Sequence, residues 1–306
     1  MFHQNREENT VKGTRKPYRF WLVVVCAIGL CVIAAGLPAS GTWSPLTGDV
    51  DLEEQPRDSA HAKFRHAAAL ISSGQLHSGI RQLKSLLGKH PEAPWAVKAR
   101  YLLGAGHYLK AEYRRAFRTL NSLRLKHPEH DLTEPALRLQ RRCAARRTEQ
   151  HLKSGLALFD RLIKNAPSRR YAARCQRAKA DALLAAGHPM RAADQYMVFI
   201  DTYPDSEHVP YAWYRLAVCD LKEARRISRG TQYLERAERQ LHDFLDKFSD
   251  HPLAAEAQET LREVNNLRTN HYRRVAAYFL GPANRPLAAL PYLDHIRNIA
   301  PDSENG

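Results

Sequence analysis

The sequence predicts an all-α fold, a right-handed solenoid of helix–turn–helix repeats, and three observations lead to this prediction. From about residue 60 onward, apolar residues recur at helical spacing and no alternating strand pattern is present. Helix-ending phrases recur through the same region. Counting back from the end of each phrase, three positions carry the same kind of side chain every time. The composition, 44% hydrophobic and 26% charged over 306 residues, is that of a folded protein.

The recurring phrases end in a helix breaker. Three of them read LLGKHP, LRLKHP and FIDTYP. Proline lacks an N–H group and its ring clashes with the preceding turn, so it stops a helix. The six closing residues, 37 to 52 positions apart, are Pro91, Pro128, Pro167, Pro204, Ser249 and Pro301. Residues 60–306 are therefore expected to hold about six helix pairs.

Each phrase also places a small residue and two large apolar residues on one helix face. Twelve positions before the closing residue stand Gly79, Ala116, Gly155, Ala192, Ala237 and Ala289. Eight positions before it stand Leu83, Leu120, Phe159, Tyr196, Leu241 and Leu293. Five positions before it stand Leu86, Leu123, Leu162, Phe199, Phe244 and Ile296. The small residue lets two helices approach closely, and the large residues fill the seam between them.

This is the tetratricopeptide pattern, whose core period is near 34 residues. Gly74 and Gly187 are expected at the turns between the two helices of a pair. Leu103 and Gly104 form the large–small pair expected where two helices cross. Extra residues at 222–230 are expected to lengthen a connection in the fifth repeat.

The N-terminal region predicts a membrane segment. Residues 20–37 contain no charged side chain, and residues 20–39 are long enough to span a membrane as a helix. Residues 1–19 are basic, so the positive-inside rule places them in the cytoplasm and the rest of the chain outside. A cleaved signal peptide is the alternative, because small residues follow at 34–36. Residues 40–59 read as an acidic, flexible linker.

The charge of the chain is concentrated rather than even. The formal net charge is +15, and residues 98–153 alone carry 14 Lys+Arg against 5 Asp+Glu. The candidate basic patch consists of Arg114, Arg115, Arg118, Arg138, Arg141, Arg142 and Arg146. An acidic protein segment or anionic lipid head groups would bind such a patch, whereas a solvated outer face would need no partner. Nucleic acid is not expected as a partner, because no aromatic platform interleaves with the basic residues.

The inner groove of a tetratricopeptide solenoid is lined mostly by the first helices of the pairs. By repeat position, the candidate partner-binding groove consists of Phe64, Ile71, Tyr101, Tyr108, Arg147 and Arg177. Aromatic and arginine side chains are good anchors for an extended peptide. Packing between repeats is the alternative role for several of them.

No catalytic constellation is present in the sequence. There is no phosphate-binding loop, no nucleophile elbow and no zinc-binding H-E-x-x-H motif. The 15 His are scattered, and Cys143, Cys175 and Cys219 are expected to be small packing residues. We therefore expect no enzyme activity, no metal and no cofactor.

The C-terminal half resembles a known family. Residues 199–207 read FIDTYPDSE, and residues 234–259 read LERAERQLHDFLDKFSDHPLAAEAQE. Residues 260–280 then read TLREVNNLRTNHYRRVAAYFL, and PLAALPYLDHIRNIAPDSE follows at 286–304. This order of insertion, repeat, long helix and final repeat resembles the BamD (ComL) outer membrane assembly lipoproteins. The resemblance extends over residues 171–304.

The resemblance implies a scaffold in the periplasm that helps a β-barrel assembly machine to fold outer membrane proteins. Members of the family are lipid-anchored at the outer membrane, but here Cys26 follows Val25 and Cys31 follows Leu30, which are poor acylation sites. We therefore expect a single-pass inner membrane protein with its C-terminal domain in the periplasm. Placement on the periplasmic face of the outer membrane, or release into the periplasm, are the alternatives. The alternative function is to coordinate cell-wall synthesis or division machinery.

Overall fold

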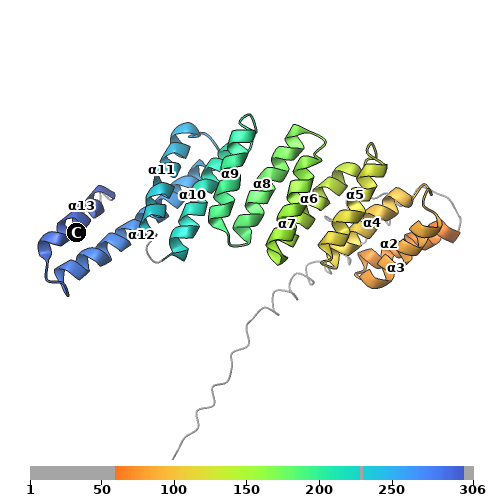
Figure 1. Ribbon diagram of the computed structural model, residues 1–306, viewed down its shortest axis with the longest axis horizontal. Helices are drawn as coiled ribbons and strands as arrows, with labels where there is room; N and C mark the ends of the chain where they lie inside the picture. Colours follow the sequence, from red (N-terminus) through yellow and green to blue (C-terminus); the bar gives the residue numbers. More distant parts are fainter. Residues whose placement is uncertain (1–58, 228–229, 300–306) are drawn as a thin grey trace, which may run out of the picture. The chain divides into compact units, whose positions relative to one another are not determined.

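The computed structural model describes residues 59–227 and 230–299, and all regular structure in these ranges is α-helical (Figure 1). The first six helices are α2 (Ser59–Ser72), α3 (Leu76–Lys89), α4 (Ala96–Leu109), α5 (Tyr113–Lys126), α6 (Thr133–Gln150) and α7 (Leu152–Lys164). The next six are α8 (Arg169–Ala185), α9 (Pro189–Thr202), α10 (Val209–Arg226), α11 (Thr231–Lys247), α12 (Ala254–Leu280) and α13 (Pro286–Ile299). The all-α prediction and the six helix pairs are confirmed over the described residues.

The predicted membrane segment at 20–39 and nearly all of the acidic linker lie outside the described residues. Within the described ranges, none of the helices combines the length and the apolar character that crossing a membrane requires.

Every helix packs against the next one along the chain, from α2 through to α13 (Figure 1). First helices also pack against the first helices of neighbouring pairs, as α4 does against α2 and α6. Second helices make no comparable contact with one another among the described residues. First helices are therefore covered on more sides than second helices, which is the tetratricopeptide arrangement.

The seam positions behave as the repeat pattern predicts in the first five pairs. All six small residues are buried, and so are both large residues of those five pairs. Close approach is visible at Gly104, where an added Cβ would lie 2.7 Å from the Leu120 side chain. At Gly155 a Cβ would meet the backbone of Thr148. Larger residues at these two positions would force the helices apart.

The last pair departs from this pattern. Ala289 is fully buried, but Leu293 is 42% exposed. Leu287 and Leu290 of the same helix are also exposed. Among the described residues α13 packs only against α12, so nothing covers its outer face.

Left-handed turns join the helices of several pairs. Gly74 has φ +83° and Gly187 has φ +80°, as expected for glycines after a helix. Ala111 occupies the corresponding turn between α4 and α5 with φ 60°, and Asn284 has φ 46° before α13. An alanine pays a steric penalty in this region that glycine avoids.

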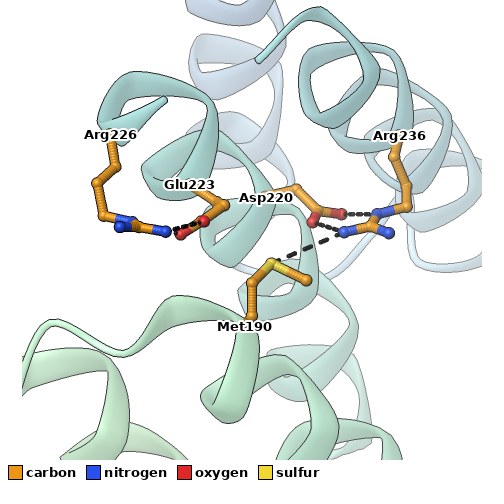
Figure 2. A network of polar contacts seen from close by, with 5 residues as sticks. All are labelled: Met190, Asp220, Glu223, Arg226 and Arg236. Carbon is orange, nitrogen blue, oxygen red and sulfur yellow. Dashed lines mark hydrogen bonds and ion pairs between the residues drawn. The ribbon is translucent and has the colours of Figure 1, made fainter. Parts of the chain in front are cut away.

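The connection between the two helices of the fifth repeat is shorter than the sequence predicted, because helix occupies part of the expected insertion at 222–230. The helix α10 continues through Arg226, so residues 222–226 are helical rather than part of a loop. Two buried carboxylates near the end of α10, Asp220 and Glu223, each pair with an arginine (Figure 2). Asp220 accepts hydrogen bonds from the guanidinium group of Arg236 on α11, where the Nε–Oδ2 distance is 2.6 Å. Glu223 accepts from Arg226, with an Nε–Oε2 distance of 2.9 Å.

Candidate binding surfaces

Three of the six predicted groove residues are part of the packed core. Phe64, Ile71 and Tyr101 are only 1%, 2% and 3% exposed. Phe64 stacks on Trp95, with ring centroids 5.3 Å apart. These side chains leave almost no surface for a partner, because first helices pack against one another as well as against second helices. Their burial favours the alternative role expected for several of these residues, packing between repeats.

The other three groove residues keep part of their surface exposed. Tyr108 packs against Tyr113 with ring centroids 5.4 Å apart. Arg147 donates hydrogen bonds to Ser154 and Gln150 around the junction of α6 and α7. Arg177 lies apart from these two, over the ring of Tyr211 on α10. Of these three residues, Arg177 belongs to a polar cluster that joins three helices.

That cluster joins three helices, and we call it the Tyr–Arg cluster: Arg177 and Asp181 of α8, Tyr196 of α9, and Tyr211 and Arg215 of α10. The carboxylate of Asp181 accepts hydrogen bonds from the hydroxyl groups of both tyrosines, and the distance to the Tyr211 oxygen is 2.9 Å. The Cζ atoms of Arg177 and Arg215 lie 5.1 and 5.6 Å from the centre of the Tyr211 ring. The Tyr211 ring is therefore fixed between two guanidinium groups.

Burial and the nearby carboxylate keep both phenols protonated. Burial raises the pKa of Tyr196 far above its usual range, and the charge of Asp181 acts in the same direction. Burial raises the pKa of Tyr211 to about 12, again with help from Asp181. Burial also lowers the pKa of His208, and the positive charge of Arg177 adds to this effect. Tyr196 is fully buried, so the partly exposed ring of Tyr211 is the aromatic surface that the cluster offers a partner. The cluster contains no activated nucleophile.

The Nε atom of Arg177 is buried without a hydrogen-bond partner in the part of the chain that the structure describes. Buried donors of this kind are costly unless something satisfies them. Because the guanidinium group stacks on Tyr211 and forms no ion pair with any residue in the described ranges, its charge is available to a partner. The cluster is therefore suited to bind an aromatic or anionic group of another molecule.

Four members of the Tyr–Arg cluster were missed in the sequence. One signal was present, since Tyr196 stands at a seam position where the other repeats have Leu or Phe. A hydroxyl group in a buried seam needs a partner. The identity of that partner, Asp181 on the preceding helix, depends on how α8 and α9 pack.

The structure places the predicted basic patch on different helices with different surroundings. Arg114, Arg115 and Arg118 lie on the second helix α5, where the last two line a hollow shared with α3. The remaining four lie on the first helix α6: Arg138, Arg141, Arg142 and Arg146. The charges of Arg138 and Arg142 act on Tyr101 of α4, whereas Arg141 acts on Cys175 of α8. The α5 and α6 arginines are therefore considered separately.

The cysteines and histidines show no reactive arrangement in the described ranges. Cys143, Cys175 and Cys219 are buried and free, and burial raises their pKa values to about 12, 11 and 12. They are inert packing residues, as the sequence predicted. Among the described residues no group of three His, Cys, Asp or Glu side chains could hold a metal ion.

Comparison with known proteins adds a family likeness for part of the chain. Residues 159–291 match the model of the YfiO family, described as outer membrane lipoproteins. This range contains the complete Tyr–Arg cluster and overlaps the region whose sequence resembles BamD-like lipoproteins. It covers less than half of the chain. A search of curated protein sequences gave no significant match.

Two solved structures illustrate the remaining likenesses. The apo form of RapI has 12% sequence identity and a TM-score of 0.37, and the alignment covers 81% of this chain and 100% of RapI. TPR-like repeats of a kinesin light chain from Podosopora anserina have 12% identity and a TM-score of 0.36, covering 64% of this chain and 100% of theirs. At these TM-scores neither likeness carries an argument about this protein.

Proposed function

We propose that the chain is a membrane-anchored scaffold that faces the periplasm, binds protein partners and takes a BamD-like part in outer membrane protein assembly. The observation behind this proposal is the match of residues 159–291 to the YfiO outer membrane lipoproteins. The proposed partner is a component of a β-barrel assembly machine. The chain acts by binding, without catalysis.

The Tyr–Arg cluster supplies the binding surface in this proposal. Arginine and tyrosine are over-represented among the residues that dominate the free energy of protein interfaces. The hydrogen bond from the partly exposed Tyr211 to Asp181 and the two stacked guanidinium groups hold the cluster in place before a partner arrives. A partner therefore loses less free energy in ordering these side chains. Arg177 offers a charged, stacked guanidinium group at the edge of the same cluster.

The N-terminal segment gives the proposed anchor. Residues 20–39 span the inner membrane, with residues 1–19 in the cytoplasm and the helix pairs in the periplasm. Mass spectrometry of the mature N-terminus tests this placement. An intact segment is the expected result. Acylation at Cys26 or Cys31 would place the chain at the outer membrane instead, and cleavage after residues 34–36 would release it into the periplasm.

Affinity purification of the full-length chain from detergent-solubilised envelopes tests the function. We expect components of a β-barrel assembly machine to co-purify, and Arg177→Ala to reduce their recovery. The control is Arg191→Ala, which removes an exposed arginine of α9 outside the cluster. Circular dichroism checks that both variants fold. Recovery of peptidoglycan-synthesis or division proteins alone would favour the alternative role, and no loss with Arg177→Ala would exclude the cluster as the binding surface.

A further inference from the structure

A strongly basic hollow lies over α4, between α3 and α5, on helices that take no part in the Tyr–Arg cluster. Two adjoining cavities of about 500 and 360 Å³ form it, and both are lined by Lys84, His107 and Arg115. Glu112 is the only acidic residue of the lining. The Lys and Arg residues of the lining are Arg81, Lys84, Arg100, Lys110, Arg115 and Arg118, and together with Glu112 and His107 we call this site the α3–α5 hollow.

The single acid of the hollow is fully engaged. The carboxylate of Glu112 forms ion pairs with Lys110 and Arg115, each at 3.1 Å, and lies 2.7 Å from the Nδ1 atom of His107. Burial alone would raise the pKa of Glu112, but the hydrogen bonds from these three residues outweigh it and hold the pKa at about 2. Glu112 is thus ionised at neutral pH and already shared between its neighbours, and it cannot neutralise the rest of the hollow.

One further cation of the hollow has a structural role. Arg100 is buried, and its two terminal nitrogens contact the Pro91 carbonyl oxygen at 2.9 Å and the His127 ring at 3.0 Å. These contacts tie α4 to the ends of α3 and α5. Arg100 therefore contributes positive charge to the hollow while its hydrogen bonds are used elsewhere.

Three cations remain with no counter-charge. Arg81 and Lys84 on α3 and Arg118 on α5 are exposed, and none has an ion pair or side-chain hydrogen bond with any residue in the described ranges. Arg81 lines one of the two adjoining cavities and Arg118 lines the other. Lys84 and Arg115 line both, so these like charges share one open hollow. Holding like charges together without a partner costs free energy that a bound anion recovers.

In the first, second and fifth repeats one position of this helix face carries an arginine: Arg81, Arg118 and Arg239. Counted from the closing residue of each repeat, Arg81 and Arg118 occupy the position that is Ala157 in the third repeat and Asp194 in the fourth. Lys84 occupies the position that is Asp160 in the third repeat. The fold therefore does not require cations here, since the same helix face carries neutral or acidic residues elsewhere in the stack.

We propose that the α3–α5 hollow binds a ligand that carries clustered phosphate groups. Lysine and arginine form short, strong hydrogen bonds to phosphate oxygens, and several phosphates match several unpaired cations. The hydroxyl groups of Ser78 and Ser122 line the same space and add neutral donors. An acidic peptide suits the site less well, because the walls of the hollow are helices whose backbone groups are already hydrogen-bonded and cannot pair with an extended chain. A phosphorylated lipid head group and a soluble polyphosphate share this chemistry.

The test measures binding by the purified full-length chain in detergent at two salt concentrations. One arm titrates inorganic pyrophosphate by calorimetry, and the other adds micelles that contain phosphatidic acid, with phosphatidylcholine micelles as reference. The variant combines Arg81→Gln, Lys84→Gln and Arg118→Gln, which remove exposed side chains without a partner and so should not disturb folding. The matched control, Arg161→Gln with Arg191→Gln and Arg239→Gln, removes three exposed cations from α7, α9 and α11.

The expected result is saturable binding of at least one phosphate probe, which the variant weakens roughly tenfold or more and the control leaves within about twofold. Binding of pyrophosphate alone identifies a soluble ligand, and binding of the acidic micelles alone or of both identifies a lipid head group. The proposal is wrong if neither probe binds, if the control loses as much affinity as the variant, or if only an Asp/Glu-rich peptide binds.

Discussion

The fifth and sixth helix pairs carry the same repeat pattern but differ in what surrounds them. In the fifth pair Leu241 and Phe244 are fully buried, between α10 on one side and α12 on the other. In the sixth pair Leu293, at the position of Leu241, is 42% exposed. The pattern therefore marks which side chains face the seam, whereas a neighbouring pair on the outer side decides how deeply they are buried. Stability in such a stack is largely a sum over neighbours.

The largest expected effect tests this difference at one repeat position. Leu241→Ala removes a fully buried side chain and should lower the free energy of unfolding by about 2–5 kcal/mol. Leu293→Ala removes a half-exposed side chain and should cost less than about 1 kcal/mol. Urea unfolding followed by circular dichroism measures both. Equal losses would mean that the sixth pair is covered as completely as the fifth.

A second comparison sets an ion pair whose carboxylate is buried against a pair whose two side chains are both exposed. Asp220 is almost fully buried beside Arg236 in the fifth pair, so Arg236→Ala strands a carboxylate and should cost about 3 kcal/mol. Arg297 and Asp294 of the sixth pair are 3.2 Å apart but both exposed, so Arg297→Ala should cost under about 0.5 kcal/mol. Thermal unfolding at matched salt gives both values. If Arg236→Ala lowered the free energy of unfolding by less than Arg297→Ala does, Asp220 would have to find another partner in the variant.

Overpacking gives the third comparison. Ala192 lies fully buried on α9, which packs against both α8 and α10, so Ala192→Leu should cost about 1–3 kcal/mol. Ala289 is equally buried on α13, but among the described residues α13 has only α12 beside it and can shift outward. Ala289→Leu should therefore cost less than half as much. An unchanged melting transition in Ala192→Leu would contradict the seam assignment.

The repeat seams could be predicted from sequence because their signals are local. A small residue, two large residues and a helix breaker at fixed spacing describe one helix by itself, and the structure confirms each helix pair. Burial of the first helices was harder to judge. Phe64 and Tyr101 looked like groove residues, but first helices pack against first helices, and that contact joins separate repeats.

The polar sites depend on partners that are distant in sequence. Asp220 pairs with Arg236 sixteen residues away, and Tyr211 reaches Asp181 thirty residues away. The sequence shows only that charged residues are abundant there. The basic block was visible as composition. Which of its cations lack a counter-charge follows from how α3 and α5 each pack against α4.

The smallest expected effect compares the stability that two turns contribute: the turn between α4 and α5 in an inner pair, and the turn between α12 and α13 in the last pair. Ala111 and Asn284 both have left-handed backbone conformations, at φ 60° and 46°. Ala111→Gly should stabilise the protein by up to about 1 kcal/mol, because the steric penalty of the Cβ exceeds the extra entropy that glycine brings to the unfolded chain. Asn284→Gly should change stability by less than about 0.3 kcal/mol, since asparagine tolerates this conformation better. Hydrogen exchange of the α4–α5 and α12–α13 amides locates each effect. The reverse change, Gly187→Ala, places an alanine in the corresponding turn between α8 and α9 and serves as the control. If Ala111→Gly instead destabilised the protein, the entropy that glycine adds to the unfolded chain would outweigh the strain that it relieves in the turn.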